Sequence, residues 1–143
     1  MITSSSYIGI DLGDVRVGIA LMRKGTSTAI PVGSFPKAKG EAESKIISLI
    51  AQEGAEKAIV GLPLSEDGSE NRQCEKVKNF CRRLARRCRI EIVLVDEYAT
   101  SMEARQRLAS ARKGRGPDRK SGIIDAVSAS ILLQYYLDSI ADS

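Results

Sequence analysis

The chain has 143 residues, the length of one ordinary domain, and 43% of them are hydrophobic and 28% charged, as in a typical soluble globular protein. No apolar run approaches the roughly 20 residues that a membrane helix needs, and the N-terminal residues lack the basic and apolar regions of a signal peptide. We therefore expect a single domain over residues 1–143 that acts in the cytoplasm, away from membranes.

The first third of the chain predicts three strands joined by short turns, and hence an antiparallel meander. A proline near the start of the third strand, Pro31, indicates an edge position in the sheet. The expected strands are Tyr7–Leu12, Val15–Met22 and Ala29–Phe35.

The rest of the chain alternates between helical and strand patterns, which is typical of parallel strands with helices on the faces of the sheet. The expected helices are Glu41–Glu53, Glu70–Arg89, Thr100–Arg112 and Ile123–Leu137. The expected strands are Lys57–Leu62 and Ile90–Val95, and a basic Gly/Pro loop covers Lys113–Ser121. This order predicts an α/β fold with a five-stranded mixed sheet.

Charge is distributed unevenly along the chain. Residues 72–120 hold fifteen basic and six acidic residues, a net charge of +9, whereas the total for the chain is +4. A middle third this basic indicates an anionic partner, with nucleic acid ahead of an acidic membrane. The alternative is a solvated helix face, above all for the row Arg82, Arg83, Arg86, Arg87 and Arg89.

Histidine is absent from the chain, which excludes acid–base and nucleophilic schemes that need an imidazole. Three cysteines, Cys74, Cys81 and Cys88, recur every seven residues on one side of a predicted helix. An odd number of cysteines argues against a disulfide framework, and the lack of a CxxC pair argues against zinc. We expect three unligated thiols on or near the core.

Carboxylates interrupt apolar segments in three separate elements. Asp11 stands in an apolar strand, Asp96 and Glu97 follow the last strand, and Asp125 lies in an apolar stretch of the last helix. Buried unpaired carboxylates are costly, and the carboxyl ends of parallel strands are where open α/β sheets place their sites. If these groups converge, they form an oxygen site suited to Mg²⁺ or Mn²⁺. A helix cap or a local salt bridge is the alternative for each one.

Four ordered blocks resemble the YqgF family, whose members are described as Holliday junction resolvases and as pre-16S rRNA nucleases. The blocks are GIDLG and RVGIA within residues 9–20, VGLPL and DGSE within 60–70, VDE, TS and EA within 95–104, and DA and ILLQ within 125–134. The resemblance spans nearly the whole chain. One position departs from it, because the family usually has Arg directly after the Asp-Glu pair, where this chain has Tyr98.

The resemblance implies an RNase H-like fold and a metal-dependent nuclease whose catalytic and metal-binding carboxylates are Asp11, Glu97 and Asp125. Two Mg²⁺ ions can activate water and stabilise the leaving oxygen of a phosphodiester without histidine. The expected phosphate contacts are basic residues near these carboxylates, namely Arg16, Arg115, Arg119 and Lys120. Arg16 has an alternative role as a structural partner of Asp14 or Glu97.

The expected activity is processing of the 5′ end of pre-16S rRNA during ribosome biogenesis, by a monomer or a homodimer. Cleavage of branched DNA is the same chemistry on another substrate, and a non-catalytic nucleic-acid-binding module is a second alternative. A Gly-Ile-Asp-Leu-Gly hairpin also binds ATP phosphates in actin-like and sugar kinases, but those proteins need two lobes and 143 residues supply one.

Overall fold

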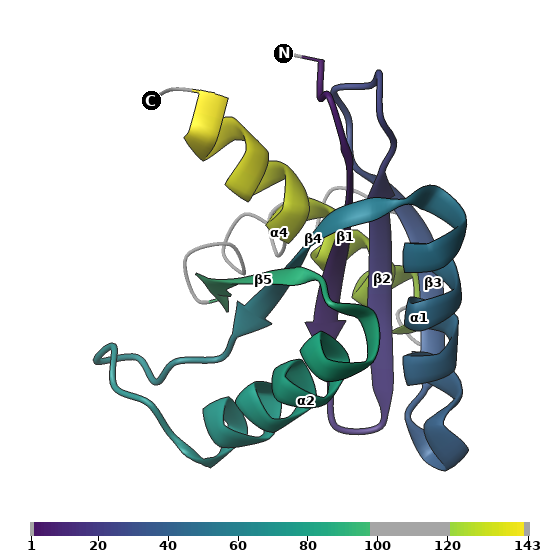
Figure 1. The fold of residues 1–143 in the computed structure, drawn as a ribbon. Helices are drawn as coiled ribbons and strands as arrows, with labels where there is room; N and C mark the ends of the chain where they lie inside the picture. The colour runs from purple at the N-terminus through teal and green to yellow at the C-terminus, as the bar shows by residue number, and fades with distance from the viewer. Residues whose placement is uncertain (1, 98–120, 142–143) are drawn as a thin grey trace, which may run out of the picture.

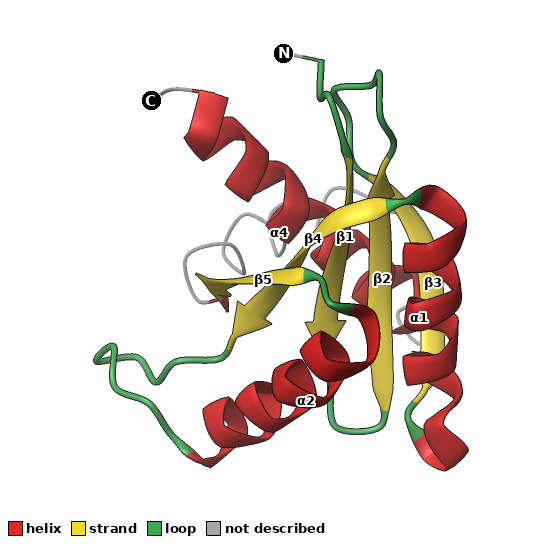
Figure 2. Cartoon of the chain, in the orientation of Figure 1, coloured by secondary structure: helices red, strands yellow, loops and turns green. Residues whose placement is uncertain are grey.

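The computed structural model describes residues 2–97 and 121–141, which form a five-stranded mixed sheet with helices on both faces (Figure 1 and Figure 2). The strands are β1 (Ser6–Leu12), β2 (Arg16–Met22), β3 (Ile30–Pro36), β4 (Ala55–Leu62) and β5 (Glu91–Asp96). The helices are the 3-10 turn η1 (Ala38–Gly40), α1 (Glu41–Glu53), α2 (Arg72–Cys88) and α4 (Ser121–Ala141).

The strand order is β3-β2-β1-β4-β5. Strands β1, β2 and β3 pair antiparallel, and β4 pairs parallel with both β1 and β5. This topology confirms the predicted meander followed by two parallel strands, and it confirms the edge position of the strand that contains Pro31.

The two faces of the sheet have different cores, because successive side chains of a strand point to opposite faces. Ile8 and Ile10 of β1 are fully buried on the face that α1 and α2 cover. Gly9 lies on the other face, where a Cβ would come within 2.9 Å of Leu133 in α4. Asp11, two residues further along β1, shares that face with Gly9 and so faces α4.

The three cysteines lie on the inner side of α2, as predicted. Cys74 and Cys81 are buried, Cys88 is half-buried, and none forms a disulfide. Burial raises the pKa of Cys81 to about 11, as expected for a thiol in an apolar core. That the thiols bind no zinc stays a prediction, which elemental analysis of the purified protein tests.

Several element ends differ from the predicted ones by a few residues. Helix α2 starts after Asn71, whose side chain accepts a hydrogen bond from the Cys74 amide at 3.1 Å. It ends at Cys88, and the next residue, Arg89, has a left-handed φ of 52°. The predicted helix Thr100–Arg112 and most of the basic loop lie outside the described residues. In the described part of the chain, no helix is long and apolar enough to cross a membrane.

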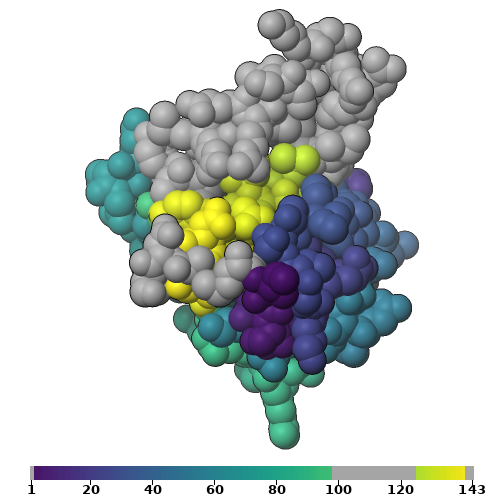
Figure 3. Space-filling model, turned by 90° about the horizontal axis from the view of Figure 1, so that it is seen from above, coloured from purple at the N-terminus to yellow at the C-terminus, as the bar shows by residue number. Residues whose placement is uncertain are grey.

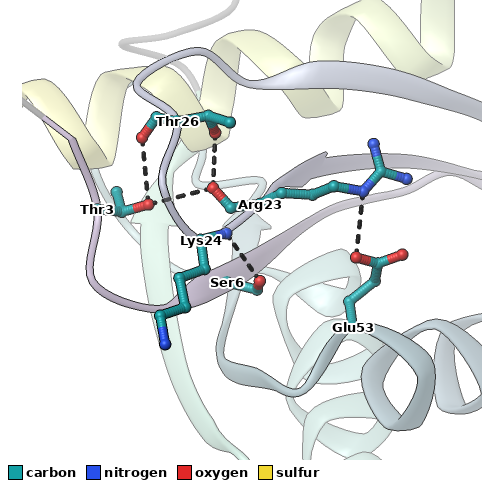
Figure 4. Close-up of polar contacts among 6 residues, drawn as sticks. All are labelled: Thr3, Ser6, Arg23, Lys24, Thr26 and Glu53. Carbon is teal, nitrogen blue, oxygen red and sulfur yellow. Dashed lines mark hydrogen bonds and ion pairs between the residues drawn. The ribbon is translucent and has the colours of Figure 1, made fainter.

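Polar contacts join the N-terminal segment to the β2–β3 loop, at the end of the sheet where β1 begins (Figure 4). The hydroxyl of Thr3 donates to the carbonyls of Arg23 and Thr26 at 3.3 and 3.2 Å, and the amide of Lys24 donates to Ser6 Oγ at 3.0 Å. Figure 3 looks onto this end. Residues of the N-terminal segment and of the last turns of α4 line a pocket here. The carboxyl end of β1 therefore lies at the opposite end of the sheet (Figure 1).

Candidate active site

A row of residues crosses the sheet near the carboxyl end of β1. Asp11 pairs with Gly18 of β2, and Gly18 pairs with Ser34 of β3. On the other side of β1, Ile10 pairs with Val60, so Asp11 and Gly61 are the next positions along the two parallel strands. Opposed residues in neighbouring strands point to the same face of a sheet, so this row lies beneath α4.

Two glycines of this row leave space on either side of Asp11. A Cβ at Gly18 would overlap the backbone carbonyl of Asp125, and a Cβ at Gly61 would lie 3.4 Å from Cδ of Glu97. Glycine inside a strand often marks such a close approach. The missing side chain of Gly18 thus allows the backbone of Asp125 to approach β2 beside Asp11, whereas Glu97 lies at ordinary contact distance from the Gly61 position on the other side of Asp11.

Asp11 and Glu97 form a hydrogen-bonded pair of carboxyl groups. Burial raises the pKa of Asp11 from 3.8 to about 9, with further contributions from the hydrogen bond to Glu97 and from the negative charge of Glu97. A carboxylate has no hydrogen to donate, so two carboxyl groups share a hydrogen bond only when one is protonated. Without a cation, the pair therefore retains a proton at neutral pH.

Asp125 is held by a chain of hydrogen bonds that starts at Arg16. Arg16 Nε donates to Ser34 Oγ at 2.9 Å, its Nη2 donates to the Ser34 carbonyl at 2.9 Å, and Ser34 Oγ donates to Asp125 Oδ2 at 3.0 Å. Burial raises the pKa of Asp125, Asp11 adds to this rise, and Ser34 and Arg16 oppose it. The structural partner of Arg16 is thus Ser34, and neither Asp14 nor Glu97 was the right expectation for it. The contact of Arg16 with phosphate stays a prediction.

The donor set fits a hard divalent cation. Asp11, Glu97 and Asp125 offer carboxylate oxygens alone, the ligands that Mg²⁺ and Mn²⁺ prefer. A cation beside Asp11 and Glu97 would replace their shared proton and offset the repulsion between the two carboxylates. Within residues 2–97 and 121–141, no three acidic, cysteine or histidine side chains are already arranged as a metal-binding cluster. Asp11 and Glu97 adjoin each other, whereas Asp125 bonds to Ser34.

The predicted phosphate contacts Arg115, Arg119 and Lys120, and Tyr98 after the Asp-Glu pair, lie outside the described residues. The arginine row of α2 is described, and it divides into two sets. Arg83 and Arg87 bind Glu43 of α1, with N–O distances of 3.4 and 2.6 Å. The second set is exposed and has no acidic partner in the described part of the chain: Arg82, Arg86 and Arg89.

The chain is similar to known proteins over nearly its whole length. A family model described as "RuvX: Holliday junction resolvase" matches residues 5–139. A Syntrophus aciditrophicus protein named "Putative pre-16S rRNA nuclease" is 37% identical over 135 residues, which cover 94% of this chain and 89% of the relative. A protein of the same name from Fusobacterium nucleatum is 35% identical over 133 residues, 92% of this chain and 96% of the relative.

Solved structures support the same fold. Thermus thermophilus RuvC in complex with a Holliday junction substrate aligns with a TM-score of 0.60 and 11% identity over 97% of each chain. Another structure of RuvC from this organism aligns with a TM-score of 0.56 and 14% identity over 94% of this chain and 96% of its own. These likenesses confirm the predicted RNase H-like fold, and the family match over residues 5–139 shows that the chain belongs to the RuvX family of Holliday junction resolvases.

Proposed function

We propose that this protein is a metal-dependent nuclease that processes the 5′ end of pre-16S rRNA during ribosome biogenesis in the cytoplasm. The observation that carries the proposal is that Asp11 lies beside both Glu97 and Asp125, with Gly18 making room for the backbone of Asp125. Relatives that span nearly the same length are named for pre-16S rRNA, which favours this substrate over other nucleic acids.

Asp11 and Glu97 would hold Mg²⁺ or Mn²⁺, with Asp125 as a third ligand. A bound divalent cation supplies Lewis-acid stabilisation of the phosphoryl oxygens and a more acidic attacking water. The pair must lose its shared proton before both carboxylates can bind a cation, so cation binding competes with protonation of Asp11. Gly18 makes room for the backbone of Asp125, because a Cβ at this position would overlap the Asp125 carbonyl.

Cleavage of a four-way DNA junction is the second candidate function, and the description of the matching family favours it. The same carboxylates would carry out the same phosphodiester hydrolysis on that substrate. The two candidates therefore differ in what holds the nucleic acid and not in the chemistry of the site.

A cleavage assay separates these functions. The purified protein is given precursor 16S rRNA, a four-way DNA junction or ATP, each with Mg²⁺, with Mn²⁺ or with a chelator. Faster metal-dependent cleavage of the rRNA at its 5′ end supports the proposal, and faster cleavage of the junction supports the second candidate. Nucleic acid binding without cleavage would mean a non-catalytic module.

Two variants connect the activity to the site. Asp11→Asn removes a proposed ligand, so cleavage should collapse. Asp14→Asn is the matched control, because Asp14 is exposed in the turn that follows the same strand. Cleavage by Asp11→Asn at the wild-type rate, or undiminished cleavage in chelator, would refute the proposed chemistry.

A further inference from the structure

We propose that Ser34 is a positioning residue of the active site, which holds one oxygen of Asp125 so that the other can bind the divalent cation. The inference rests on the proposed function, because it concerns the cation that Asp11, Glu97 and Asp125 would share. None of the motifs that carry the family resemblance includes Ser34.

The direction of the hydrogen bonds follows from the donors. A serine hydroxyl has a single hydrogen, whereas an arginine guanidinium has donors alone. Because Arg16 Nε donates to Ser34 Oγ at 2.9 Å, the hydroxyl hydrogen of Ser34 is left for Asp125 Oδ2, 3.0 Å away. Ser34 therefore always presents a donor to Asp125, and Asp125 Oδ2 always accepts.

Arg16 also fixes the place of Ser34. It binds the hydroxyl and the backbone carbonyl of Ser34, each at 2.9 Å, so the residue is held by its side chain and its main chain together. Strand β3 is the edge of the sheet, so Ser34 has a neighbouring strand on one side only. That strand is β2, and its Arg16 supplies both bonds.

The bond from Ser34 occupies one carboxylate oxygen of Asp125, Oδ2. Among residues 2–97 and 125–141, whose side chains the structure describes, no donor binds the other oxygen, Oδ1. Asp125 also lies over Gly18, which separates Ser34 from Asp11 in the row, and it is near enough to Asp11 for the two carboxyl groups to interact electrostatically. With Oδ2 held by Ser34, Oδ1 is the oxygen of Asp125 that would bind a cation shared with Asp11.

Groups that orient a metal ligand typically change metal affinity by about 10–100-fold when they are removed. A residue with a purely structural role would lower the stability of the fold and leave metal affinity unchanged. The measurement that separates these roles is Mn²⁺ affinity of the free protein, determined by calorimetry without nucleic acid, together with the Mg²⁺ concentration that gives half-maximal cleavage.

Three variants make up the test. Ser34→Ala should weaken Mn²⁺ binding about 10-fold or more and raise the half-maximal Mg²⁺ concentration by a similar factor, with most of kcat retained at saturating Mg²⁺. Ser34→Thr keeps the hydroxyl and should restore most of the affinity. Ser130→Ala is the control, because Ser130 is a half-buried serine of α4 whose hydroxyl donates to the Val127 carbonyl, and it should bind Mn²⁺ as the wild type does.

The outcomes distinguish the inference from the function on which it rests. Unchanged Mn²⁺ affinity in Ser34→Ala, beside a wild type that binds Mn²⁺, overturns the role of Ser34 alone. A wild type that binds no Mn²⁺ and cleaves in chelator overturns the metal-dependent function as well. Loss of affinity in Ser34→Ala without rescue by Ser34→Thr also overturns the inference, because the hydroxyl would then not be the group that matters.

Discussion

Replacing Asp11 with Asn should make the metal-free protein more stable while it abolishes activity. Burial and the neighbouring Glu97 raise the pKa of Asp11 to about 9, against 3.8 for an unperturbed aspartate. The folded protein therefore holds a proton on this pair over a pH range in which the unfolded chain has released it. Stability is complete below pH 4 and declines as the pH rises toward 9, because the unfolded state loses the proton first.

The size of the effect follows from the shift. Each pKa unit corresponds to about 1.4 kcal/mol, and neutral pH lies about three units above the ordinary pKa of aspartate. Asp11 therefore costs the metal-free fold up to roughly 4 kcal/mol at pH 7. Asparagine has nearly the same shape, carries no charge and can donate a hydrogen bond to Glu97, so we expect it to recover about 1–4 kcal/mol.

Urea unfolding of wild type, Asp11→Asn and the exposed control Asp14→Asn, in chelator at pH 4 to 9, measures this difference. The gain from Asp11→Asn should be near zero at pH 4 and should grow toward pH 9, while Asp14→Asn shows no such trend. Mn²⁺ should stabilise the wild type and not Asp11→Asn. An Asp11→Asn protein that is no more stable than the wild type at pH 8 would show that Asp11 is not the strained carboxyl group that the geometry indicates.

Two further predictions concern the close approach of α4 and the hold on nucleic acid. Gly18→Ala should lower the free energy of unfolding by about 3 kcal/mol, because its Cβ would overlap the Asp125 carbonyl. Gly33→Ala is the control, and it should lower the free energy of unfolding far less, because its Cβ would meet only the Phe35 ring, 3.2 Å away. Replacing Arg115, Arg119 and Lys120 together with Ala should reduce the slope of log affinity against log salt concentration for RNA binding by up to about three units. A wild-type slope would place the RNA contacts on the exposed residues Arg82, Arg86 and Arg89 instead.

Much of the fold could be predicted, because it rests on local signals. The turns after Leu12 and Met22 are short, which leaves the first three strands little choice but antiparallel pairing. Helix ends were less accurate, because they depend on single residues such as Asn71, which caps α2, and Arg89, which adopts a left-handed conformation that arginine rarely favours.

The carboxylates of the site were predictable for a different reason. Asp11 and Asp125 interrupt apolar stretches. Burying an unpaired carboxylate costs free energy, so a carboxylate in such a stretch indicates a partner or a ligand. The glycines beside them also carried a signal, since Gly18 and Gly61 lie inside strand patterns where glycine is unfavourable. Ser34 carried none, because its bond to Asp125 joins residues 91 positions apart.

The charge pattern shows the same limit. Composition predicted a basic surface, but not which arginines are paired. Glu43 lies 40 and 44 residues before Arg83 and Arg87, and no local pattern connects it to them. The sequence therefore predicts how much charge the surface carries, whereas the fold decides which part of that charge is available to a partner.

Strand β1 contributes to the hydrophobic core on one face of the sheet and to the candidate active site on the other. Ile8 and Ile10 of β1 are fully buried beneath α1 and α2, on a face filled by large apolar side chains. The residues that alternate with them, Gly9 and Asp11, face α4 and contribute little apolar burial. The α4 face has an apolar core of its own, in which Ile59 and Leu133 are fully buried, and the carboxyl pair lies beside that core, near the carboxyl end of β1. Because its side chains alternate between the two faces, β1 can lie at the centre of the core on one face of the sheet and at the centre of the candidate active site on the other.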